Sequence, residues 1–79
     1  MLTTYIRAAM ERAEYSIIDD GVHYAEIPDL PGVWGEGDTR AAAEQDLREV
    51  LEGWIVLRFQ HHLPIPAISG HSLQLVEVN

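Results

Sequence analysis

The chain contains no cysteine and no lysine, so all five of its basic residues are arginines. Without thiols it can form neither a disulfide framework nor a thiolate zinc site. Its 13 acidic residues give a formal net charge of −8, which repels the phosphates of nucleic acids. We therefore expect no direct nucleic-acid binding, and the charge favours a basic protein as partner.

The sequence also lacks a membrane-length apolar run, and its polar start, Met1 to Thr4, has no apolar signal core. We expect a cytoplasmic protein without membrane contact. A chain of 79 residues, 47% of them hydrophobic, can build one small core. We expect a single domain over residues 1–79, with no separate DNA-binding domain after the last predicted strand.

Two segments have the composition and spacing of helices. Residues 3–12 are good helix formers without glycine or proline, and residues 40–61 repeat apolar side chains at helical spacing. Asp38 or Thr39 is the expected cap of the second helix, and Pro64 follows its end. The predicted apolar stripe of this helix is Ala43, Leu47, Val50, Trp54 and Leu57, flanked by Leu51, Ile55 and Phe59.

Four short segments are typical of strands: residues 15–18, 22–27, 33–36 and 72–78. Asp20-Gly21 predicts a type I′ turn between the first two, with Ile18 opposite His23 and Ile17 opposite Tyr24. In this register both faces of the hairpin are partly apolar. This pattern predicts self-association into a dimer or tetramer.

The predicted elements follow the order α-β-β-β-α-β, which indicates an α+β fold. A meander of three antiparallel strands followed by a crossover helix leads to a four-stranded sheet with strand order 3-2-1-4 and helices packed on one face.

No residue pattern indicates catalysis, a cofactor or a metal. The run Gly35-Glu36-Gly37 lacks the third glycine of a phosphate loop, and its acid would repel phosphate. Adjacent His61 and His62 point apart on a helix, and no serine lies in a nucleophile context. We expect no enzyme. A hydrolase or metal enzyme would require a bound ion on ligands such as His61, His71 and Glu77.

The informative stretch is residues 24–34, where acids alternate with aromatic residues beside a rigid Pro-Gly bend. For Trp34 the favoured interpretation is a core position against Trp54, and direct partner contact is the alternative. We expect four acids to gather at one end of the meander, where they would complement a basic surface: Glu26, Asp29, Glu36 and Asp38. The predicted partner-binding residues are Tyr24, Glu26, Asp29, Trp34, Glu36 and Asp38.

Five short motifs share the order and spacing of a known family: YAEIP at 24–28, LPGVW at 30–34, GDT at 37–39, EVLEGWI at 49–55 and LPIP at 63–66. With these motifs the sequence resembles the short form of the HicB antitoxin family of bacterial toxin–antitoxin modules. The resemblance implies a partial ribonuclease-H-like fold. Only Glu26 is a suitable strand carboxylate for ribonuclease H chemistry, so nuclease activity is not carried over.

The resemblance further implies a non-enzymatic antitoxin, in effect a ribonuclease inhibitor. Its partner would be a small, basic HicA-type toxin that cleaves mRNA, neutralised when the antitoxin covers its RNA-binding and active-site face. The alternative is an orphan HicB-like module that forms homo-oligomers and binds a different protein.

Overall fold

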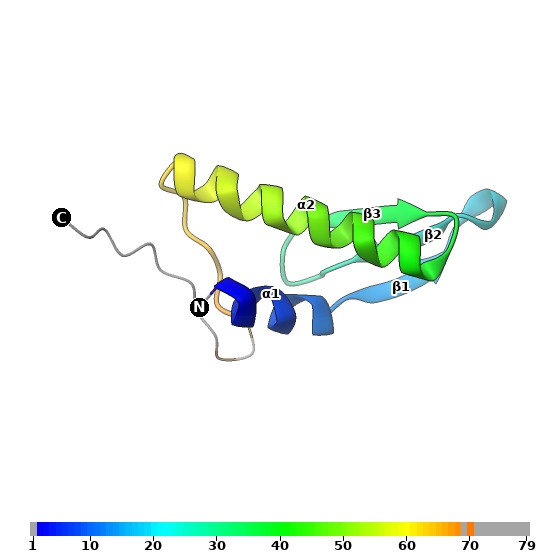
Figure 1. Cartoon of the computed structure of the whole chain (residues 1–79), viewed down its shortest axis with the longest axis horizontal. Coiled ribbons are helices and arrows are strands. Elements are labelled where there is room, and N and C mark those ends of the chain that lie inside the picture. The colour runs from blue at the N-terminus through cyan, green and yellow to red at the C-terminus, as the bar shows by residue number, and fades with distance from the viewer. Residues whose placement is uncertain (1, 69, 71–79) are drawn as a thin grey trace.

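The computed structural model describes residues 2–68 and 70 of the chain. Its elements are α1 (Leu2–Glu11), β1 (Glu14–Ile17), the short 3-10 turn η1 (Asp19–Gly21), β2 (His23–Glu26), β3 (Trp34–Gly37) and α2 (Arg40–Gln60) (Figure 1). The predicted α+β order of helix, three strands and helix is confirmed. The predicted strand at 72–78, and with it the four-stranded sheet, lies outside the described residues.

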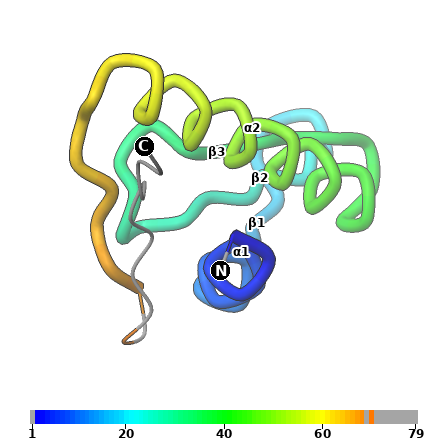
Figure 2. Tube along the Cα trace, turned by 60° about the vertical axis from the view of Figure 1, so that its left-hand side comes forward, coloured from blue at the N-terminus to red at the C-terminus, as the bar shows by residue number. Residues whose placement is uncertain are grey.

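The three strands form one antiparallel sheet in the order β1-β2-β3, so the meander is as predicted. Helix α2 covers one face of this sheet and runs along β3 and β2 (Figure 1, Figure 2). Helix α1 precedes β1 and contacts α2. The outer face of the sheet, which we define as the face turned away from α2, carries none of the described helices.

The hairpin between β1 and β2 differs from its predicted register by one residue. Asp20 and Gly21 have positive φ angles of 63° and 73°, as the type I′ turn requires. However, the backbone N–H of Ile18 donates to Val22 at 2.8 Å, so one extra residue enters the loop and Ile17 lies opposite His23. A shift of one residue exchanges the faces of one strand relative to the other.

The corrected register places Tyr15 opposite Ala25 and Ser16 opposite Tyr24. Tyr15 therefore lies on the helix face and Tyr24 on the outer face, whereas the predicted register had put both tyrosines on one face. Two partly apolar hairpin faces in the predicted register indicated self-association, and the observed register does not reproduce them.

Helix α2 begins where the sequence predicts, because the Thr39 hydroxyl accepts a hydrogen bond from the Ala42 N–H at 3.0 Å. Its buried stripe is rotated from the predicted one. The fully buried positions repeat every four residues: Ala43, Leu47, Leu51 and Ile55. Trp54 is half-buried and Leu57 is 56% exposed, so Leu57 was wrongly assigned to the core.

The chain returns from α2 to close the core beside α1. The Tyr5 hydroxyl donates to the Pro66 carbonyl oxygen at 2.6 Å, and Ile68 is buried. Burial raises the pKa of Tyr5, with a smaller contribution from the charge of Asp29. This contact fixes the proline segment that follows α2 against the first helix.

Candidate functional site

The outer face gathers four of the six predicted partner-binding residues. Side chains alternate along each strand, and Ala25 and Gly35 are buried toward α2, so their neighbours point away from the helix. The strand residues of the outer face are Glu14, Ser16, Tyr24, Glu26, Trp34 and Glu36. Sequence reasoning selected Tyr24, Glu26, Trp34 and Glu36, and the sheet brings these four together.

Tyr24 and Trp34 form a stacked aromatic pair on this face. Their ring centroids are 5.8 Å apart and the rings are inclined by 24°. Trp34 is 47% exposed, so the interpretation of Trp34 as a core residue against Trp54 is wrong. Trp54 belongs to α2 on the other side of the sheet, where the Arg58 guanidinium carbon lies 4.9 Å from the centre of its ring.

The acids of the outer face lie directly beside the aromatic pair. Glu36 is opposite Tyr24, Glu26 is opposite Trp34, and Glu14 is opposite Glu26 in the other ladder. Two carboxylates in opposite positions repel each other. The Tyr24 hydroxyl donates a hydrogen bond to the Glu26 carboxylate at 3.4 Å. Desolvation raises the pKa of Tyr24, and the negative charge of Glu26 raises it further.

The two remaining predicted residues lie elsewhere. Asp29 is in the loop between β2 and β3, next to the Trp34 end of β3, while Asp38 follows the Gly37 end. The expected gathering of all the acids at one end of the meander is therefore wrong, because the antiparallel ladder separates these two positions.

Asp29 also differs from the outer-face acids because it has an internal counter-ion. Two nitrogens of Arg12 donate to its carboxylate at 3.0 and 2.9 Å. This bidentate hydrogen bonding lowers the pKa of Asp29 and outweighs the opposing effect of desolvation. Its charge is thus less available to a partner than the charges of Glu26 and Glu36.

The helix face of β3 has no room for side chains. A Cβ atom at Gly35 would lie 2.5 Å from the Leu47 nitrogen, so glycine permits the close approach of α2. This packing accounts for the Gly35-Glu36-Gly37 run, whose phosphate-loop interpretation the sequence already disfavoured. The Asp46 side chain of α2 accepts a hydrogen bond from the Glu36 N–H at 3.0 Å, a contact that sequence reasoning missed.

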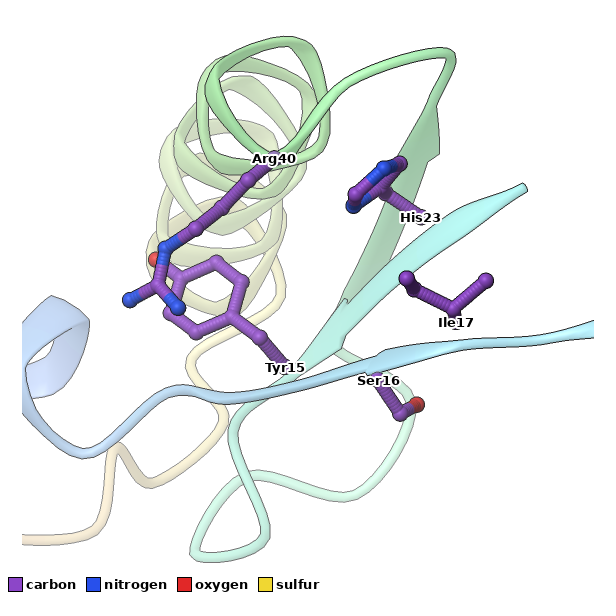
Figure 3. Close-up of a pocket in the computed structure, with 5 residues that line it drawn as sticks. All are labelled: Tyr15, Ser16, Ile17, His23 and Arg40. Carbon is purple, nitrogen blue, oxygen red and sulfur yellow. The ribbon is translucent and has the colours of Figure 1, made fainter. Parts of the chain in front are cut away.

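A pocket of about 190 Å³ lies at the start of α2, lined by Tyr15, Ser16, Ile17, His23 and Arg40. Figure 3 shows Ser16 on the opposite side of its strand from Tyr15 and His23. The Arg40 guanidinium carbon lies 3.9 Å from the centre of the Tyr15 ring. Because Ser16 points away from His23, these two residues do not form a nucleophile and base.

Within residues 2–68 and Gly70, no group of three or more His, Asp or Glu side chains is arranged to hold a metal ion. The metal-ligand set considered in the sequence included His71 and Glu77, which lie outside the described residues. Among the described helices, none combines the length and the apolar character needed to cross a membrane.

A model of the UPF0150-like family matches residues 4–66. The chain belongs to the UPF0150-like family. This family includes HicB-like antitoxins. The crystal structure of TTHA0281 from Thermus thermophilus is similar to the chain at 36% sequence identity, with a TM-score of 0.90 over 96% of this chain and 95% of the other. No curated protein matches the chain.

Proposed function

We propose that this UPF0150-like chain is a HicB-type antitoxin that binds and neutralises a small, basic HicA-type mRNA-cleaving toxin. The observation that carries the proposal is the outer face of the sheet. It presents Tyr24 and Trp34 beside Glu26 and Glu36, and none of the three described strands contains an arginine. Aromatic residues are enriched in protein-binding surfaces, and the acids around them would complement a basic partner.

Charge complementarity supports a basic partner. An RNA-cleaving protein needs a positive surface to hold its substrate, and this chain carries a net charge of −8. Opposite charges accelerate encounter and orient the two surfaces before contact. An acidic face that covers the RNA-binding surface of the toxin would inhibit it without any chemical step, so the proposed protein is not an enzyme.

Two finer features belong to the same proposal. Residues 72–78 are expected to supply a fourth strand beside β1 and so to complete the partial ribonuclease-H-like sheet. Formation of a homo-oligomer, predicted from the sequence, is the second feature, and the exposed apolar side chains of Ile17, Ile18 and Trp34 support it. Membership of a family that includes HicB-like antitoxins supports the proposal as a whole.

The test is co-expression with any small basic protein that is encoded beside this chain's gene, followed by size-exclusion chromatography with light scattering and an RNA-cleavage assay. We expect a stable complex in which cleavage is suppressed. The variant Glu26→Lys/Glu36→Lys should weaken this complex, whereas Glu49→Lys/Glu52→Lys changes the net charge equally on exposed positions of α2 and should leave it intact.

If both variants weaken the complex equally, the toxin does not bind through the outer face. Absence of a complex, with the chain alone forming a stable oligomer, would overturn the antitoxin proposal and favour the orphan module with another protein partner.

A further inference from the structure

We infer that the outer face recognises an arginine side chain of its partner, with the guanidinium stacked on the Tyr24–Trp34 pair and bound at its edge by Glu26 and Glu36. This inference rests on the proposed function only for the name of the partner. The arrangement itself follows from the described residues.

The four side chains form a compact square on the sheet. The Glu36 N–H donates to Asp46 of α2 and not to β2, so Tyr24 and Glu36 are a non-hydrogen-bonded pair. Glu26 and Trp34 lie two positions further along the ladder and are therefore the same kind of pair. Side chains in such pairs are the closer ones, about 4.5 Å apart at Cα. The aromatic rings thus occupy one diagonal and the carboxylates the other.

The same molecule shows how its aromatic rings bind guanidinium groups. Arg40 lies over the Tyr15 ring at 3.9 Å, and Glu44 approaches the Tyr15 hydroxyl at 3.4 Å. Arg58 lies 4.9 Å from the ring of Trp54. Both arginines belong to α2, so both pairs form on the helix side of the sheet.

No guanidinium of the described residues lies over the Tyr24–Trp34 pair, although this pair has the acids that such a cation needs. Glu14 opposite Glu26 adds repulsion on the same face. A cation from a partner would relieve this repulsion and occupy the aromatic surface. The excess of negative charge makes a second copy of this chain a poor donor of that cation.

Arginine fits this square better than lysine. A guanidinium is planar, stacks on aromatic rings and donates two parallel hydrogen bonds to a carboxylate. An ammonium is a strongly hydrated point charge that cannot make both contacts in one plane. The face therefore discriminates between two partner side chains of equal charge.

The test uses the full chain and two capped peptides, one with two arginines separated by glycine and one with lysines in the same positions. Binding is followed in ¹H–¹⁵N spectra through the indole N–H of Trp34, with Trp54 as the internal reference. We expect the arginine peptide to shift the Trp34 signal and to bind about two- to fivefold more tightly than the lysine peptide, because only a guanidinium can stack on the aromatic pair and at the same time donate in its plane to the carboxylates.

Two double variants distinguish binding by these four side chains from general charge attraction. Glu26→Gln/Glu36→Gln should abolish the preference for arginine, whereas Glu49→Gln/Glu52→Gln removes the same charge from α2 and should keep it. Trp34→Ala, followed through the Tyr24 backbone amide, should also lose the preference. Equal binding of the two peptides, or loss of the preference in the α2 control, would overturn the inference.

The peptide experiment tests the inference and the toxin experiment tests the proposed function, so a negative result in one does not decide the other. A preference for the arginine peptide without toxin binding would sustain the inference and overturn the proposed function. A toxin complex that survives Trp34→Ala and Glu26→Gln/Glu36→Gln unchanged would overturn the inference and sustain the proposed function.

Discussion

The two faces of the sheet are built from the same strands, yet one is covered by a helix and the other carries none of the described helices. On the helix face Ala25 and Gly35 are buried and allow α2 to lie directly on the backbone. On the outer face Trp34 and the neighbouring acids are exposed, and Tyr24 is half-buried. Alternate residues of one strand can therefore stabilise the fold, while the others stay accessible for the recognition proposed above.

The largest effect should come from removing a buried side chain of α2. We expect Leu47→Ala to lower the free energy of unfolding by about 2–5 kcal/mol, because it leaves a cavity under the helix. The matched control is Leu57→Ala, an exposed leucine of the same helix, which should change stability by no more than about 0.5 kcal/mol. Urea unfolding followed by circular dichroism measures both. Similar losses would show that the helix face is assigned incorrectly.

A second prediction concerns the close approach of α2 to β3. Gly35→Ala should destabilise the fold by about 1–3 kcal/mol, since its methyl group would clash with the α2 backbone. Gly53→Ala adds the same methyl where nothing lies within 4 Å, so it should stabilise the helix by up to about 1 kcal/mol. Thermal melting of the two variants should therefore shift in opposite directions; a shift of both in one direction would contradict the packing described for Gly35.

The two tryptophans provide the direct comparison of the faces. Trp34→Ala should leave the melting temperature nearly unchanged, because the side chain is largely exposed on the outer face. Trp54→Ala should lower the free energy of unfolding more than Trp34→Ala does. The loss should stay below about 3–5 kcal/mol, the value for a fully buried tryptophan, because Trp54 is only half-buried. A lower melting temperature for Trp34→Ala than for Trp54→Ala would contradict this assignment of the two tryptophans to the faces.

The smallest effect is expected at the Arg12–Asp29 ion pair. Hydrogen bonds from Arg12 lower the pKa of Asp29 below its usual 3.8, so the pair stabilises the fold above that pH and loses its effect as the pH falls further. Both side chains are solvent-accessible and salt screens them. Asp29→Asn should lower the melting temperature slightly at pH 7 in low salt. At pH 2 or in high salt, wild type and variant should melt together, and a persistent difference would contradict the role of the ion pair.

Much of the fold could be predicted because its signals are local. Apolar residues at helical spacing predicted α2, and Thr39 stands where a capping residue is needed. The proline segment after α2 marked its end. Asp20-Gly21 likewise predicted positive φ angles at the hairpin turn.

The errors came from features that local patterns do not specify. The register of the hairpin depends on whether Ile18 or Asp19 pairs with Val22. The backbone hydrogen bond from Ile18 to Val22 decides this and puts Tyr24 on the opposite face from Tyr15. The buried stripe of α2 depended on how the helix rotates over Gly35 and Gly37, so Leu57 was misplaced.

The candidate site shows the same division. The sequence alone determined the charge, the absence of thiols and lysines, the element order and the residue types between positions 24 and 38. Only the tertiary structure decided that Tyr24, Glu26, Trp34 and Glu36 share one exposed face and that Asp29 is paired with Arg12. The physical reason is that composition and capping act within a few residues, whereas face and pairing depend on strand register and helix packing between distant segments.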